Sequence, residues 1–113
     1  MRGITTHVLD TSRGRPAAGM RITLEIQTAG DGWVPVGDGV TDDDGRVPGL
    51  AGDGAPAKGV HRMTFFTGEW FEAEGIEGFY PLVTIECLID DPLAHYHIPL
   101  LISPYGYSTY RGS

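Results

Sequence analysis

Hydrophobic and polar residues alternate along several short stretches of this sequence. The clearest stretch is AGMRITLEIQT, residues 18–28, in which four apolar side chains would share one face and four polar side chains the other. Alternation with a period of two is typical of a strand that buries one face. In YPLVTIECLID, residues 80–90, the side chains of Val83, Ile85, Cys87 and Ile89 would likewise face a core. Both stretches therefore predict half-buried strands.

Further strand-like stretches bring the expected number of strands to seven or eight. They are ITTHVLD (4–10), GWVPVGDGVT (32–41), HRMTFFT (61–67), HYHIPLLIS (95–103) and GYSTYRG (106–112). In the first of them Thr5, His7 and Leu9 would lie on one face. Pro35 cannot donate a hydrogen bond to a neighbouring strand, so it predicts that residues 32–41 form an edge strand.

Glycine and proline leave room for a single short helix. The chain has 17 Gly and 8 Pro, which interrupt regular structure. The helix is expected in TGEWFEAEGI, residues 67–76, with Thr67 as its cap and Gly75 at its end. TDDDGRV, residues 41–47, predicts a turn through Asp44-Gly45. Short strands with turns between them indicate one all-β domain over residues 1–113, an antiparallel β-sandwich.

The charge of the chain narrows the possible partners. The formal net charge is -7 and the isoelectric point about 4.8. We therefore expect no binding to nucleic acid or to an anionic membrane, both of which need a basic surface. Cys87 is the only cysteine, so no internal disulfide is possible. The first residues lack the apolar segment of a signal peptide, which favours a cytoplasmic location.

The pair His95 and His97 is the first candidate for chemistry. In a strand, residues two apart lie on one face, about 6–7 Å from each other. Two imidazoles can share a metal, but a catalytic zinc takes three protein ligands. His7 or His61 would have to be the third. The alternative, one histidine at a site and the other hydrogen-bonded at an edge, is favoured, and we expect no metal and no cofactor.

Three other features are better explained without catalysis. Asp42, Asp43 and Asp44 lack the spaced ligands and distant glutamate of a calcium loop, so a solvated turn is expected. Cys87 lies in an apolar strand, which is typical of an inert buried thiol. No serine has the G-x-S-x-G context of a hydrolase nucleophile.

Taken together, three motifs resemble one family. ITTHVLDTSRGRPA, TDDDGR and HYHIPLLISPYGYSTYRGS are similar to the 5-hydroxyisourate hydrolases, the transthyretin-related enzymes of purine breakdown. The resemblance covers the whole chain, and the terminal Tyr-Arg-Gly-Ser is its most specific element. Transthyretin itself lacks this ending and also the His and Arg of the site. Cys87, Trp70 and His61 depart from the commoner pattern and are expected outside the site.

The resemblance implies a fold, an assembly and a set of site residues. The fold would be a transthyretin-like sandwich of about eight strands with one short helix. The assembly would be a homotetramer, a dimer of dimers, with sites at the interface between dimers. The implied catalytic residues are His7, Arg46 and His97. The residues implied to bind substrate are His7, Arg46, Tyr110, Arg111, Gly112 and Ser113.

The implied reaction is hydrolysis of 5-hydroxyisourate to 2-oxo-4-hydroxy-4-carboxy-5-ureidoimidazoline. The attacking water needs a base with a pKa near neutral, which is the range of imidazole. We expect His7 as the base and His97 as its proton partner, although the sequence does not decide between them. Arg46 would stabilise the negative charge on the acyl oxygen. Tyr110 would donate a hydrogen bond, and Arg111 would pair with an acidic group.

Two other functions are compatible with the sequence. One is a transthyretin-like protein that binds a small ligand without catalysis, and the other is a structural sandwich module. A carrier of an apolar ligand needs an apolar channel with few polar groups. The converging His, Arg and Tyr side chains favour the hydrolase, and the module leaves the terminal motif unexplained.

Overall fold

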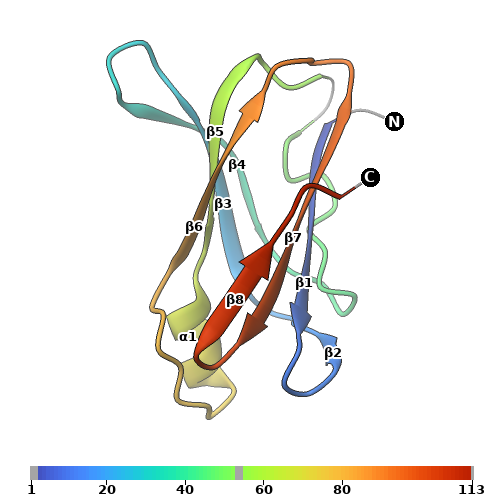
Figure 1. Cartoon of the computed structure of the whole chain (residues 1–113), viewed down its shortest axis with the longest axis vertical. Helices are drawn as coiled ribbons and strands as arrows, with labels where there is room; N and C mark the ends of the chain where they lie inside the picture. Colours follow the sequence, from blue (N-terminus) through green and yellow to red (C-terminus); the bar gives the residue numbers. More distant parts are fainter. Residues whose placement is uncertain (1–2, 53–54, 113) are drawn as a thin grey trace.

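Two four-stranded sheets packed face to face make up the computed structural model, which describes residues 3–52 and 55–112 (Figure 1). The first sheet has the order β2 (Arg15–Pro16), β1 (Gly3–Asp10), β7 (His95–Ser103), β8 (Gly106–Thr109). The second has the order β4 (Trp33–Val40), β3 (Arg21–Gln27), β5 (Gly59–Phe65), β6 (Val83–Ile89). Helix α1 (Thr67–Ala73) connects β5 to β6. These eight strands and one helix of the described residues confirm the predicted sandwich.

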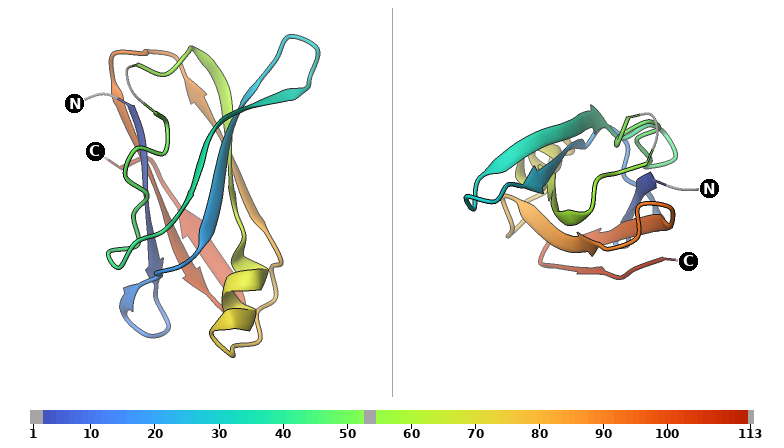
Figure 2. Two further views of the ribbon diagram at one scale, coloured as in Figure 1. Left: turned by 180° about the vertical axis from the view of Figure 1, so that it is seen from behind. Right: turned by 90° about the horizontal axis from the view of Figure 1, so that it is seen from above.

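The core lies between the sheets and is built by the alternation read from the sequence. Its fully buried side chains include Val8, Ile22, Leu24, Met63, Phe65, Ile89, Leu100 and Ile102. Burying one such side chain stabilises a fold by about 1.5–3 kcal/mol relative to leaving it exposed. The view from above in Figure 2 shows the two sheets facing each other.

One strand pair departs from the antiparallel prediction. β1 and β7 run parallel, with Thr5 opposite His97 and His7 opposite Pro99. A parallel pair needs a long connection, and here the second sheet and the helix lie in sequence between the two strands. The pairing places β1 and β7 side by side along the whole of β1, and both strands begin at the end of the sandwich away from α1 (Figure 1).

The ends of α1 match the prediction only in part. Thr67 does not cap the helix, since the cap position is Phe66 and has no side-chain hydrogen bond. The Thr67 hydroxyl instead donates to the Tyr80 carbonyl at 2.7 Å and ties the helix to the segment before β6. Gly75 does follow the helix end, with φ of 70°, as predicted.

The prediction that residues 32–41 form an edge strand is confirmed. β4 is the outer strand of its sheet, and Pro35 lies opposite Glu25 beside a bulge. α1, the helix of the described residues, is too short to cross a membrane.

Candidate active site

Four polar residues gather on the outward face of β1 and β7. Thr5 and His7 come from β1 and His95 and His97 from β7, each half-buried between core residues that point inward. The Thr5 hydroxyl lies 2.9 Å from His95 Nε2 and 2.9 Å from His97 Nδ1. The two imidazole rings stack with centroids 6.3 Å apart. The alternation of both strands and their parallel register therefore create a cluster of hydrogen-bonding groups.

Arg46 reaches this face from the loop between β4 and β5. The Asp42 carboxylate accepts hydrogen bonds from the Asp44 and Arg46 backbone N–H groups, at 2.9 and 3.0 Å. The Gly45 carbonyl accepts from the Val8 N–H of β1 at 2.8 Å. The predicted Asp-Gly turn is thus confirmed, and it docks the loop onto β1; Figure 2 shows the green segment running beside that strand.

Gly45 is required for this docking. Its φ is 78°, and a Cβ added there would lie 2.3 Å from the Val8 carbonyl oxygen. No L side chain fits that approach. The same Cβ would lie 3.3 Å from His7 Cδ2, so the turn before Arg46 also packs against His7.

A cavity of about 480 Å³ lies where the loop meets the sheet. Its lining residues are Thr5, Thr6, Arg46, Val47, Pro48, Gly49, His95 and His97. Two of the predicted catalytic residues, Arg46 and His97, thus share one cavity. The described residues that line it do not include His7, which lies against Gly45 of the turn.

Burial and nearby charge change the acid–base behaviour of His97. Burial lowers the pKa of His97, and the positive charge of Arg46 lowers it further, with smaller contributions from His95 and His7. Both causes disfavour the imidazolium form. His97 is therefore neutral near pH 7 and has a lone pair available to take a proton.

The C-terminal tail is pinned directly against His97. Gly112 forms a β-bridge with His97 and donates its N–H to the His97 carbonyl at 2.7 Å. A Cβ on Gly112 would lie 2.6 Å from His97 Cδ2, so the predicted close approach at this glycine is observed. Ser113, the last residue of the predicted site, lies outside the described residues.

Tyr110 and Arg111 are not brought into the cavity with Arg46. Thr109 pairs with Leu100 and Gly112 with His97, so the tail stays in register and alternation directs Tyr110 to the face of His97. Its side chain is 60% exposed. Both residues border a second cavity of about 280 Å³, which Cys87 also lines.

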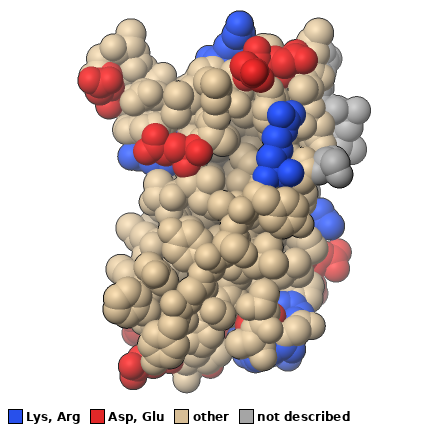
Figure 3. Space-filling model, in the orientation of Figure 1, with Lys and Arg blue, Asp and Glu red and all other residues tan. Residues whose placement is uncertain are grey.

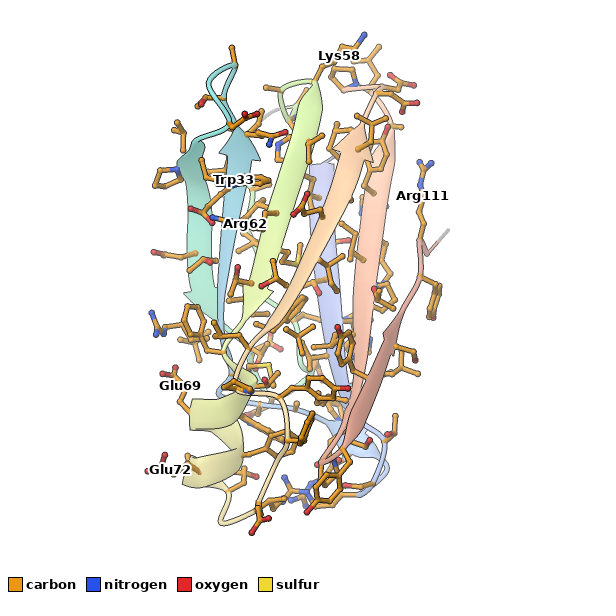
Figure 4. All side chains as sticks on the ribbon, turned by 60° about the vertical axis from the view of Figure 1, so that its left-hand side comes forward. Trp33, Lys58, Arg62, Glu69, Glu72 and Arg111 are labelled. Carbon is orange, nitrogen blue, oxygen red and sulfur yellow. The ribbon has the colours of Figure 1, made fainter. Side chains whose placement is uncertain are left out.

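Arg111 contacts an aromatic side chain, whereas we expected an acidic partner from the sequence. Its guanidinium lies 4.3 Å from the ring centroid of Tyr96, and Figure 4 shows it extending from the tail. Tyr96 is buried, and its hydroxyl donates to Asp90 Oδ1 at 2.7 Å. That hydrogen bond lowers the pKa of Asp90, and the charge of Arg111 adds to the effect. Arg111 therefore contacts Tyr96, and the acidic group, Asp90, is hydrogen-bonded to the hydroxyl of that tyrosine.

The remaining candidates lie away from the cavity. His61 belongs to β5 in the other sheet, is 1% exposed and contacts the Gly59 carbonyl through Nδ1 at 3.2 Å, so it is not a third metal ligand. Residues 3–52 and 55–112 contain no group of three His, Cys, Asp or Glu side chains placed to hold a metal ion. Cys87 is half-buried, and burial raises the pKa of its thiol.

Sequence reasoning missed Thr5 and Tyr96. Thr5 shares a strand face with His7, which was visible as alternation, but its contact with both histidines depends on the parallel register of β1 and β7. Tyr96 lies between the two histidines in the sequence and faces the core. Its place on the apolar face of the strand therefore predicted a packing role only.

Comparison with known proteins gives consistent matches over the length of the chain. The model of the HIUase/Transthyretin family matches residues 4–112. The 5-hydroxyisourate hydrolase of Salmonella dublin is 44% identical over 110 residues, covering 97% of this chain and 80% of that protein. These matches confirm the family resemblance.

Two solved structures share the fold. Sea bream transthyretin in complex with thyroxine matches with a TM-score of 0.87 and 28% identity, covering 96% of this chain and 93% of that one. This match confirms the transthyretin-like architecture. (S)-Allantoin synthase matches with a TM-score of 0.83 and 40% identity; the match covers 97% of this chain but only 43% of that longer chain.

Proposed function

Because this chain belongs to the HIUase/transthyretin family, we propose that it hydrolyses 5-hydroxyisourate to 2-oxo-4-hydroxy-4-carboxy-5-ureidoimidazoline in urate breakdown. The observation that carries the proposal is the cavity in which the Arg46 guanidinium and the His97 imidazole lie together. The substrate is a flat polar lactam, and this cavity offers the cation of Arg46 and the neutral imidazole of His97 to its carbonyl and N–H edges. The name of the relative from Salmonella dublin supports the same activity.

Water attack on a ring amide requires a base at neutral pH. The sequence favours His7 for this role, with His97 as its partner. The geometry supports the reverse order, because His97 lines the cavity and its lowered pKa keeps it neutral. The Thr5 hydroxyl is hydrogen-bonded to Nδ1 of His97, so Nε2 is the atom that would take the proton from water. General base catalysis of this kind contributes about 10²- to 10⁴-fold.

Arg46 would stabilise the negative charge that develops on the acyl oxygen. One such donor is worth about 2.7–4 kcal/mol of transition-state stabilisation in other enzymes. Asp42 and Gly45 hold the backbone of Arg46, so only its side chain has to be ordered when substrate binds. When the tetrahedral intermediate collapses, the C–N bond breaks and the ring nitrogen takes the proton held by His97.

The tail would complete the site in an assembly of several copies. We propose the homotetramer that the family resemblance implies, with sites between dimers. Support comes from the outer strands β6 and β8, which expose Leu82, Leu88, Tyr105, Tyr107 and Tyr110 near or along their lengths. Figure 3 shows that the middle of this face is largely uncharged. Tyr110 would donate its phenol hydrogen to substrate there.

The second candidate function is a carrier of an apolar ligand, favoured by the structural match to thyroxine-bound sea bream transthyretin. A site for an apolar ligand is lined mainly by hydrophobic and aromatic side chains. The cavity here has Arg46, His95, His97 and two threonines in its wall. This lining is better matched to a polar heterocycle and to proton transfer.

One experiment distinguishes the hydrolase from the carrier. Freshly generated 5-hydroxyisourate is followed by ultraviolet absorbance with and without the protein. We expect its decay to accelerate in proportion to protein concentration, and His97→Asn to remove most of the acceleration. A decay rate that the protein leaves unchanged, combined with stoichiometric binding of thyroxine, would favour the carrier.

A further inference from the structure

The Thr5 hydroxyl joins two imidazoles that have different positions in the site. It lies 2.9 Å from His95 Nε2 and 2.9 Å from His97 Nδ1. A hydroxyl has a single hydrogen to donate and lone pairs with which to accept. It can therefore donate to one ring and accept from the other.

The single hydroxyl hydrogen makes the proton positions on the two rings depend on each other. When Thr5 donates to His97 Nδ1, the neutral ring of His97 has its proton on Nε2, and His95 Nε2–H donates to Thr5. When His97 Nδ1–H donates to Thr5, the hydroxyl donates to His95 Nε2, and His97 Nε2 has a free lone pair. The first arrangement presents an acid at His97 Nε2, and the second presents a base.

We propose that Thr5 relays a proton between His97 and His95, so that His97 acts first as the base and then as the acid of the same turnover. This inference rests on the proposed hydrolysis and names the groups through which His97 works. Thr5 and His95 are positioning residues, because they act on the reaction through His97.

The relay balances over one turnover. His97 Nε2 takes a proton from the attacking water, its Nδ1 proton passes to the Thr5 oxygen, and the Thr5 hydrogen passes to His95 Nε2. His95 then holds the positive charge, and His97 is neutral with a proton on Nε2. That proton goes to the leaving ring nitrogen as the C–N bond breaks. The Thr5 hydrogen returns to His97 Nδ1 and the His95 proton to Thr5, which restores the starting state.

The electrostatic surroundings favour such a transfer. The groups that face His97 are Arg46 from the loop, His7 from β1, His95 from its own strand and the tail at Gly112. Burial and the charge of Arg46 lower the pKa of His97, so a proton is poorly held on that ring. Moving the proton to His95 removes the charge from the ring that is buried and repelled.

A mutant cycle on Thr5 and His95 tests the relay. Thr5→Val keeps the shape of the side chain and removes the hydroxyl, Thr5→Ser keeps the hydroxyl, and His95→Asn removes the second ring. Thr11→Val is the matched control, because the Thr11 hydroxyl likewise bonds β7 but outside the site, where it donates to the Ile102 carbonyl at 3.1 Å. Circular dichroism and thermal melting check that each variant folds.

We expect kcat to fall about tenfold or more in Thr5→Val and in His95→Asn, with KM little changed. The double variant should be no slower than either single variant, because both changes interrupt one path. Thr5→Ser and Thr11→Val should stay within about twofold of the parent chain. Effects that multiply in the double variant, or a Thr5→Ser variant as slow as Thr5→Val, would overturn the relay.

A second readout needs no substrate. The ¹⁵N chemical shifts of the His97 ring report which nitrogen holds the proton. We expect His95→Asn to change this tautomer ratio when Thr5 is present and to leave it unchanged in a Thr5→Val background. Equal changes in both backgrounds would contradict the coupling. If the parent chain did not hydrolyse 5-hydroxyisourate, the proposed function would fail, while this measurement would still decide whether the two rings are linked.

Discussion

Arg46 has two separable effects on the proposed reaction. Its charge would stabilise the developing oxyanion, and it lowers the pKa of His97. We expect Arg46→Gln to reduce kcat/KM by about 10²- to 10³-fold. The acid limb of the pH profile should also move to higher pH, because His97 without this repulsion binds a proton more readily.

The matched control for this change is Arg21→Gln. Arg21 has the same charge and lies on β3 of the other sheet, where it pairs with Glu69 of α1. It should change neither kcat/KM nor the acid limb. An Arg46→Gln variant with an unshifted acid limb would show that Arg46 does not influence the titrating base.

His61 makes the stability of the fold depend on pH. Burial lowers the pKa of His61 in the folded chain, so below its ordinary value of about 6.5 the unfolded chain binds the proton more strongly. The stability due to neutral His61 is therefore present above about pH 6.5 and lost as the pH falls. Urea unfolding at pH 7.5 and pH 5 should show a smaller loss of stability in His61→Gln than in the parent chain. Equal losses would remove His61 as a cause.

At the scale of elements, the C-terminal tail and β7 position His97 together. A Cβ on Gly112 would lie 2.6 Å from His97 Cδ2, so Gly112→Ala must displace either the tail or the ring. We expect kcat/KM to fall about tenfold while the thermal midpoint changes little, because the tail lies outside the core. Steady-state kinetics and melting curves measure both quantities.

Gly106→Ala provides the comparison within the same terminal segment. A Cβ there would meet only the Ser103 hydroxyl oxygen, at an ordinary 3.7 Å. Its kcat/KM should stay close to that of the parent chain. If Gly112→Ala were equally active, the tail would have no part in placing His97.

The sequence predicts those strands that have a local signal, but not the pairing between distant strands. Alternation locates β3, β6 and β7, and Pro35 correctly predicts an edge strand, because these signals are local to each stretch. The parallel pairing of β1 with β7 joins residues about ninety positions apart and has no local signal. The contact of Thr5 with His95 and His97 depends on that pairing, so alternation alone does not reveal it. The pair His95 and His97 is visible from its spacing in a strand, whereas Arg46 as a site residue came from the family motif.

At the scale of the whole molecule, the proposed assembly decides where Tyr110 works. Within one chain Tyr110 is exposed and stays outside the cavity with Arg46. We expect light scattering after size-exclusion chromatography to give four times the 12.2 kDa of the chain. Removal of residues 110–113 should lower kcat/KM sharply. A monomer with full activity would show that one chain contains the complete site.

The central step of the proposed function is the opening of a purine lactam between Arg46 and His97. A crystal structure with a non-hydrolysable purine analogue tests this directly, since it shows where the ring binds. We predict the analogue in the cavity of about 480 Å³, with a carbonyl oxygen facing Arg46 and a ring edge facing His97 Nε2. Density for the analogue only in the second cavity, between Cys87 and Arg111, would contradict it.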